Sequence, residues 1–214
     1  MYAGINGAFS GKVGTVNGYL WNGIPVMRAN PKKRTGPLSD KQLQQHAKFA
    51  LMTKFLKPLV SFTNQTFETE SIRVTGFNKA YSYNVKNAIA GIHTEPQIDY
   101  KMVKVGRGDL PGAQMPFVKS FVAGELTVTW TDNSGSGLAR DTDQLFVAVF
   151  NEELNDWTCH LSLASRAATT ASLQAPKFIN KIMHVYLGFL SANGKNTSDS
   201  QYLGEVAEIL TNIK

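Results

Sequence analysis

The order of apolar and polar residues divides the chain into three parts, of which the first is rich in glycine. Residues 12–21 and 24–28 carry β-branched and aromatic side chains, and they predict two short strands joined at Asn22-Gly23, a strong signal for a tight hairpin turn. Six glycines lie between Gly4 and Gly23. They permit close backbone contacts but supply no side chains for a core. Residues 1–38 are therefore predicted to form a Gly-rich β arm that ends in a basic loop.

Residues 39–110 follow a helical pattern. Ser39, with Gln42 three positions later, fits the capping box that begins a helix. Pro58 is expected to kink or end this helix, because proline lacks a backbone N–H and clashes with the preceding turn. A second helix is predicted over residues 77–90. The apolar stripes of the two helices consist of Leu43, Ala47, Ala50, Leu51, Phe55 and Leu59, and of Phe77, Tyr81, Val85 and Ala88.

Residues 111–214 change to the alternation that is typical of strands. Leu126, Val128 and Trp130 share one face of a predicted strand, whereas residues 145–150 are apolar on both faces, as in a central strand. About seven short strands with regular turn signals describe a sandwich. The predicted fold class is α+β: a Gly-rich N-terminal β segment with two helices, followed by an antiparallel β-sandwich, in the regions 1–38, 39–110 and 111–214.

The sandwich region resembles a fibronectin type III domain in the order of its features. Trp130 lies on an early strand, and residues 173–176 (Leu-Gln-Ala-Pro) precede a strand that carries Tyr186. Residues 191–194 (Ser-Ala-Asn-Gly) then form the last predicted hairpin. The resemblance implies a fold used for adhesion, spacing and assembly, and it implies no chemistry.

Longer motifs extend over nearly the whole chain. They are Gly7-Ala-Phe-Ser-Gly-Lys-Val-Gly14, Gly18-Tyr-Leu-Trp-Asn-Gly23, Val26-Met-Arg28, Gln45-His-Ala-Lys-Phe49, Tyr83-Asn-Val-Lys-Asn-Ala-Ile89, Leu110-Pro-Gly112, Thr129-Trp-Thr-Asp-Asn-Ser-Gly135 and Val185-Tyr-Leu-Gly-Phe189. In these motifs the chain resembles a domain-of-unknown-function family of Bacteroidota, with some members of prophage origin. His46 departs from the family pattern, which has arginine there, and this puts a charge of that motif in doubt. The resemblance implies no activity or cofactor.

Composition and charge narrow the possible partners. The single cysteine, Cys159, excludes an internal disulfide framework and fits a reducing compartment. No apolar run is long enough to span a bilayer, and the N-terminus does not follow the pattern of a signal peptide. We therefore expect a location in the cytoplasm or in a virion-like particle, without a membrane partner. The net charge is +8 over residues 1–60 and −2 over the remainder, so an anionic partner is expected to meet the N-terminal third.

The sequence predicts no catalytic, metal-binding or cofactor-binding set, and thus a protein that is not an enzyme. Residues 133–137 (Asn-Ser-Gly-Ser-Gly) approximate a nucleophile motif, but they lie in a polar turn between strands rather than at a strand-to-helix elbow. The carboxylates of Asp141 and Asp143 are expected to be solvated loop charges. His184 is expected on the outer sheet surface, where it shares a face with Tyr186. Residues 107–109 (Arg-Gly-Asp) are predicted to form a turn between regions.

The N-terminal third carries the strongest functional candidates, and three interpretations are open. In the first, Tyr19 and Trp21 stack on bases while nearby cations follow a nucleic-acid backbone. In the second, the two rings pack on the first helix. In the third, the arm docks on a neighbouring subunit, because its strand edges are ready templates for pairing. The candidate subunit contacts are Tyr19, Trp21 and Val26, and the candidate nucleic-acid contacts are Arg28, Lys32, Lys33 and Arg34.

The third interpretation is favoured. The sequence then predicts a non-enzymatic, self-assembling structural protein of phage-like character whose partner is a further copy of itself. The alternative is a nucleic-acid-binding module that uses the basic N-terminal third. The two hypotheses differ in what Trp21 contacts and in whether binding depends on salt.

Overall fold

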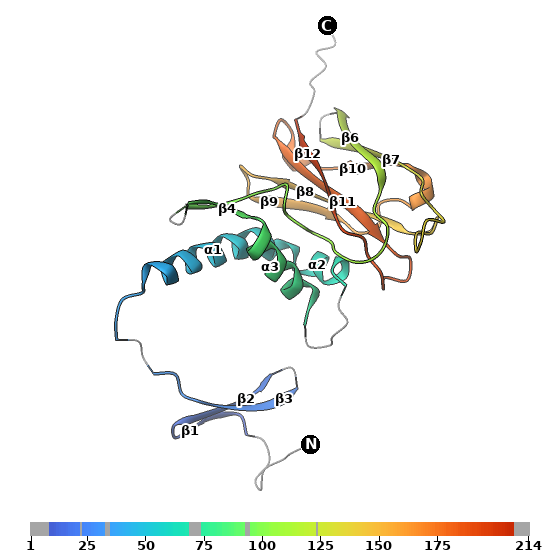
Figure 1. The fold of residues 1–214 in the computed structure, drawn as a ribbon. Helices are drawn as coiled ribbons and strands as arrows, with labels where there is room; N and C mark the ends of the chain where they lie inside the picture. Colours follow the sequence, from blue (N-terminus) through green and yellow to red (C-terminus); the bar gives the residue numbers. More distant parts are fainter. Residues whose placement is uncertain are drawn as a thin grey trace. The chain divides into compact units, whose positions relative to one another are not determined.

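The computed structural model describes residues 9–21, 23–32, 35–68, 74–92, 95–122 and 124–207. By its internal contacts the chain divides into two compact units, Met1–Asp40 and Lys41–Lys214 (Figure 1). The first unit contains the arm. The second contains the helices and the sandwich, and each unit is described by itself.

The arm is a three-stranded antiparallel sheet with the order β1-β2-β3. The sequence predicts two strands in the arm, whereas the structure has three. The first predicted strand is divided by a turn at Gly14 and Thr15, where Gly14 has a positive φ of 58°. Trp21 pairs with Ile24, and Gly23 has a positive φ of 77°. Asn22 of the predicted Asn22-Gly23 turn lies outside the described residues. The strands are β1 (Gly11–Val13), β2 (Val16–Trp21) and β3 (Ile24–Ala29).

The helices begin the second unit. Pro58 ends the first long helix as predicted: it lies in a short 3-10 turn, Lys57–Leu59, after which the chain returns to the α conformation. The second predicted helix begins at Gly76, where the Thr75 hydroxyl accepts a hydrogen bond from the backbone N–H of Asn78. The α-helices are α1 (Asp40–Leu56), α2 (Val60–Thr66) and α3 (Gly76–Asn87).

A hairpin of β4 (Ile89–Ile92) and β5 (Glu95–Ile98) follows α3. The remaining strands form two antiparallel sheets, a three-stranded one with the order β10-β7-β6 and a four-stranded one with the order β12-β11-β8-β9. Their strands are β6 (Gln114–Val122), β7 (Glu125–Thr131), β8 (Gln144–Asn151), β9 (Asp156–His160), β10 (Thr170–Gln174), β11 (Met183–Leu190) and β12 (Gln201–Val206).

The four-stranded sheet is buried on both faces. On one face, Val147 and Val149 of β8 pack with Leu126, Val128 and Trp130 of β7, which are buried as their alternation predicts. The other face packs against the helices, which lie along one side of the sandwich in Figure 1. Its aromatic and aliphatic core consists of Met52, Phe55, Leu56, Leu59, Phe62, Ala88, Val103, Val105, Phe146, Ala148, Phe150, Trp157 and Tyr186.

Gly188 of β11 is required by the core between the four-stranded sheet and the helices. Phe146 is fully buried and meets the ring of Phe62 edge-on, with 5.7 Å between the ring centroids. A Cβ atom at Gly188 would lie 2.4 Å from the Cζ atom of Phe146. Since no side chain fits at that distance, glycine at this position allows β11 to lie directly under the Phe146 ring.

The architecture confirms the predicted fold class, α+β with an antiparallel β-sandwich. The sequence predicts residues 39–110 and 111–214 as separate regions, but in the structure the helices and the four-stranded sheet share a core. The physical reason lies in β8, whose apolar side chains on both faces need two covers. The facing sheet supplies one cover and the helices supply the other.

Candidate assembly surface on the N-terminal arm

The register of the arm gathers the candidate subunit contacts on one face. Tyr19 pairs with Val26, and Trp21 pairs with Ile24 in the same ladder. Because directly paired residues point to the same side of a sheet, these four side chains form one apolar surface, called here the Trp21 face. Trp21 exposes 50% of its surface and Ile24 exposes 37%. The three candidate subunit contacts are thus neighbours in the structure.

The opposite face of the arm is also apolar. Val13, Leu20 and Met27 expose 63, 65 and 68% of their surfaces. Phe9 covers the middle of this face, where a Cβ atom at Gly18 would lie 2.8 Å from the Phe9 ring and 2.4 Å from its carbonyl oxygen. Glycine at this position therefore allows Phe9 to lie flat on β2. Phe9 leaves the outer part of that face uncovered.

The arm also presents strand edges. Among the described residues, β1 and β3 each pair with β2 alone, so each has one edge with backbone groups that no strand pairs. The end of β3 is fastened to the first turn, because the N–H of Asn30 donates to the Thr15 carbonyl and its side-chain amide donates to the Gly14 carbonyl. Such edges accept a further strand readily.

The candidate nucleic-acid contacts are only partly brought together. Arg28 pairs with Asn17, so it belongs to the Trp21 face, and its guanidinium carbon lies 5.6 Å from the centre of the Tyr19 ring. Lys32 is exposed beyond the end of β3. Lys33 and Arg34 lie outside the described residues. The structure therefore places one cation of the four beside an aromatic ring.

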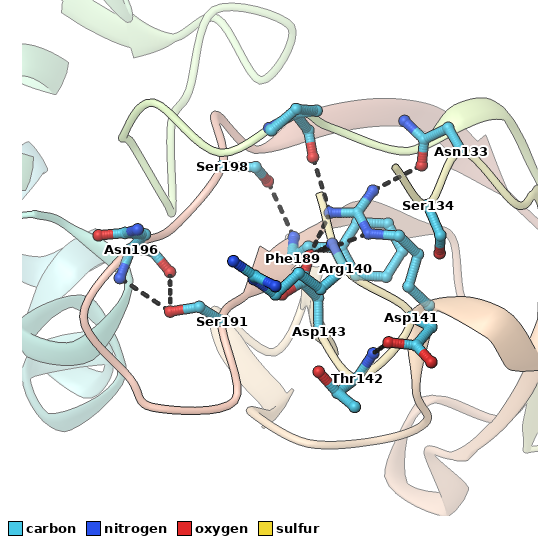
Figure 2. A network of polar contacts seen from close by, with 12 residues as sticks. Asn133, Ser134, Arg140, Asp141, Thr142, Asp143, Phe189, Ser191, Asn196 and Ser198 are labelled. Atoms are coloured by element: carbon cyan, nitrogen blue, oxygen red, sulfur yellow. Dashed lines mark hydrogen bonds and ion pairs between the residues drawn. The ribbon is translucent and has the colours of Figure 1, made fainter. Parts of the chain in front are cut away.

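The sandwich contains a buried charge that the sequence did not single out. Arg166 has no exposed surface and forms an ion pair with Asp143, with 3.1 Å between Nη2 and Oδ2. Asp143 is itself buried, which corrects its expected place as a solvated loop charge; Asp141, two residues away, is exposed as expected. Figure 2 shows the polar network around Asp143 and Asn133.

The guanidinium of Arg166 makes four hydrogen bonds and one ion pair within the fold. The Nε and Nη2 atoms lie 3.1 Å from Asp143 Oδ2, and Nη1 donates to Asn133 Oδ1 at 2.6 Å. The other two hydrogen bonds are accepted by the carbonyl oxygens of Pro111 and Gly112. Burial lowers the pKa of Arg166, and the charge of Asp143 opposes that effect. Because two of these hydrogen bonds run to the carbonyl oxygens of Pro111 and Gly112, the buried pair fastens the segment before β6 to the sandwich.

The other sequence motifs are structural. Ser134 is an exposed turn residue whose hydroxyl donates to Asp132 at 2.5 Å. Burial raises the pKa of the Cys159 thiol to about 12, so the thiolate form is scarce at neutral pH. His184 is buried, not on the outer surface as expected, because Tyr100 stacks on its ring with 3.9 Å between centroids.

The Arg-Gly-Asp segment is not the turn that the sequence predicted. Arg107 forms a parallel bridge with Phe67, and Asp109 forms an antiparallel bridge with Ser198. The segment therefore lies between the end of α2 and the chain before β12, with a bend at Gly108. Its place in the fold is fixed by backbone hydrogen bonds, including one of 2.8 Å from the Arg107 N–H to the Thr66 carbonyl.

The described residues contain no cluster of three or more histidine, cysteine, aspartate or glutamate side chains that could hold a metal ion. Likewise, no helix in the described part of the chain is both long enough and apolar enough to cross a bilayer.

Fold and surface together define an α+β protein in which a β-sandwich and a helical layer form one unit and a separate sheet carries the candidate surface. The chain belongs to a family of unknown function (DUF6266), whose sequence model matches residues 8–204. Half of the chain matches fibronectin type III domains among solved structures. The fibronectin type III domain of human collagen alpha-1(XX) shares 15% identity, with 49% of this chain and 91% of that chain covered and a TM-score of 0.36. That of human contactin 1 shares 10% identity, with 50% and 86% covered and a TM-score of 0.33. The chain has no significant match among curated proteins.

Proposed function

We propose that this is a non-enzymatic structural protein that assembles with further copies of itself, using the Trp21 face for subunit contacts. The observation that carries the proposal is the pair of apolar faces on a three-stranded sheet. A unit of this size, Met1–Asp40, buries little surface of its own, and chains below about 40 residues usually need oligomerisation or another staple to be stable. Contact with a second copy would remove Trp21, Tyr19 and Val26 from water and thereby stabilise the arm.

The free edges of the arm support the same contact. A strand of another subunit can add to β1 or β3 through backbone hydrogen bonds, while the apolar side chains set its register. Aromatic side chains such as Trp21 tend to carry most of the free energy of an interface. An origin in Bacteroidota, a phage-derived role and a place in the cytoplasm or a virion-like particle belong to this proposal, and the sequence motifs are their support.

The direct test is the mass of the full-length protein in solution, followed by light scattering over a range of concentrations. We expect an oligomer whose population rises with concentration. Trp21→Ala should raise the concentration for half-assembly by roughly thirtyfold, which is the effect of losing about 2 kcal/mol at an interface. A protein that stays monomeric at the highest concentrations would contradict the proposal.

Leu20→Ala is the matched control. Leu20 is as exposed as Trp21 but belongs to the opposite face of the same strand. We expect it to shift assembly much less than Trp21→Ala does. If Leu20→Ala had the larger effect, self-assembly would stand and the Trp21 face would be the wrong contact surface.

Nucleic-acid binding by the N-terminal third is a second candidate, favoured by the position of Arg28 over the Tyr19 ring. Each phosphate that a cation neutralises contributes about −0.9 to the slope of log affinity against log salt on duplex DNA. Replacing Arg28, Lys32, Lys33 and Arg34 together with alanine should therefore reduce that slope by roughly four units. A gel-shift series in increasing salt measures it, and no retardation at low salt would eliminate this candidate.

A further inference from the structure

The helical layer carries a polar pocket that the assembly proposal does not use. It has a volume of about 710 Å³, and it is lined by α3, the end of α2 and the Arg-Gly-Asp segment. A volume of this size is within the range of small-molecule sites. Its charged and aromatic lining residues are Glu68, Lys79, Tyr83, Lys86, Arg107 and Asp109.

One wall of the pocket is a single stripe of α3. Lys79, Ser82, Tyr83, Lys86 and Asn87 are spaced by three or four positions, and residues with this spacing share a face of a helix. The opposite face of α3, which includes Phe77 and Tyr81, packs on the core beneath the four-stranded sheet. Packing thus fixes the rotation of α3 and directs both lysines toward the pocket.

Arg107 supplies a third cation from the facing wall. Its guanidinium carbon lies 5.1 Å from the centre of the Tyr83 ring, a distance at which the ring and the cation attract each other. The backbone of Arg107 is bonded to Thr66 and Glu68, so its position does not depend on the side chain. Arg107 belongs to none of the ion pairs in the described part of the chain, which are Lys104–Asp199, Arg166–Asp143, Lys177–Asp156 and Lys181–Glu153.

Two carboxylates also line the pocket, but one of them is held by the fold. An oxygen of Glu68 accepts the backbone N–H of Thr197 at 2.6 Å, and its backbone carbonyl accepts the Lys79 ammonium at 2.7 Å. Asp109 is exposed at the rim of the pocket. With three cations and two carboxylates the pocket has a net charge of +1.

We propose that this pocket binds a phosphorylated ligand. Arginine can hold two phosphate oxygens at once through its planar guanidinium, and lysine adds a compact charge with several donors. Cations on two facing walls suit a ligand with more than one phosphoryl group better than a single small anion. The Arg107 guanidinium, which lies over the Tyr83 ring, is planar and can stack on a base. A free nucleotide and the backbone of a single-stranded nucleic acid share this chemistry.

The test is calorimetric titration of the full-length protein with three probes: inorganic pyrophosphate, a nucleoside triphosphate and a single-stranded oligonucleotide. The double variant Lys86→Gln with Arg107→Gln should weaken pyrophosphate binding by roughly tenfold or more, because hydrogen bonds to charged groups are the strong ones. The control, Lys57→Gln with Lys101→Gln, removes the same charge from two exposed positions outside the pocket lining. It should change the affinity by less than about twofold.

The probes distinguish the two sources of the phosphate. A free nucleotide is indicated if the triphosphate binds more tightly than pyrophosphate and Tyr83→Leu removes that difference. A nucleic-acid backbone is indicated if the oligonucleotide binds most tightly and its affinity falls steeply with salt. Asp109→Asn should tighten the binding of every probe, since it removes a negative charge from the rim.

Two results would overturn the proposal. One is the absence of binding heat for all three probes with a protein whose thermal unfolding is normal. The other is an equal loss of affinity in the pocket variant and the control variant, which would mean that only the overall charge matters. The pocket lies within residues 41–214, so either result leaves the assembly proposal for the arm untouched.

Discussion

Strands with apolar side chains on both faces occur in both units of the protein, but their side chains are buried in one unit and exposed in the other. In β8, residues 145–150 are all buried, because the facing sheet covers one side and the helices cover the other. In the arm, Trp21, Leu20 and Met27 remain half exposed or more. The same sequence pattern therefore forms part of a closed core in one unit and an exposed apolar surface in the other.

The difference has an energetic consequence. Burial of apolar surface is the main favourable term in folding, so the unit of residues 41–214 contains its own source of stability. The arm buries little apolar surface between its strands, and contacts beyond its three strands must supply the remainder. Substitutions in the two units should therefore affect different measurements.

Phe55→Ala should have the largest effect on folding. Phe55 is 1% exposed and lies 4.8 Å from Phe150 and 5.0 Å from Trp157, measured between ring centroids. Truncation of such a ring leaves a cavity and costs about 3–5 kcal/mol. Urea unfolding followed by tryptophan fluorescence measures the loss. If Phe55→Ala changed the free energy of unfolding by less than about 1 kcal/mol, the shared core of helices and sheet would be in doubt.

Arg166→Met should destabilise the same unit by about 3 kcal/mol or more, because it leaves the Asp143 carboxylate buried without its partner. Asn133 Oδ1 and the Pro111 carbonyl oxygen would lose their donor as well, whereas the Gly112 carbonyl oxygen would keep the Asn133 side-chain amide at 3.0 Å. The double variant Arg166→Met with Asp143→Leu removes both charges and should recover much of the loss. If the double variant were less stable than Arg166→Met alone, the loss of the ion pair would not explain the destabilisation. Urea unfolding of the three proteins gives the comparison.

The sequence was most informative where a pattern depends on neighbours along the chain. The alternation of Leu126, Val128 and Trp130 predicts a strand, and the structure has it as β7. Pro58 interrupts the first helix as its chemistry requires. The missed turn at Gly14 shows the limit of such patterns, because a single glycine within an apolar run is compatible with both a strand and a turn.

Features that depend on distant contacts could not be predicted in the same way. Asp143 looks like any loop carboxylate until Arg166, 23 residues later, is placed beside it. The stripe of Lys79, Tyr83 and Lys86 was visible in the helical spacing, whereas the position of Arg107 opposite that stripe depends on its bridge to Phe67. Because β8 is apolar on both faces, the sequence indicated that both faces are covered. It did not indicate that the helices cover one of them.

His184 should make the second unit weaken in mild acid. Burial lowers its pKa, with Glu205 and Glu152 opposing the effect. Its folded pKa thus lies below the unfolded value near 6.5, so the unfolded chain binds the proton first and stability falls as the pH drops below about 6.5. His184→Gln should flatten this part of the profile, whereas His160→Gln, at an exposed position of β9, should not. Thermal unfolding between pH 5 and 8 measures both, and identical profiles would exclude His184 as the cause.

Trp21→Ala should have the smallest effect on folding, and this result separates the three interpretations of the arm. The ring is half exposed within its own chain, so its loss should change the unfolding free energy of residues 41–214 by less than about 0.5 kcal/mol. Packing on the first helix instead predicts a loss of about 3–5 kcal/mol, as for Phe55. Stacking on bases predicts unchanged folding and assembly, with nucleic-acid affinity reduced by about 1–3 kcal/mol. Under the subunit contact, only the concentration needed for assembly rises, because the ring is then buried by the next copy rather than by its own chain. Unfolding and light scattering on the same samples therefore decide which surface completes the arm.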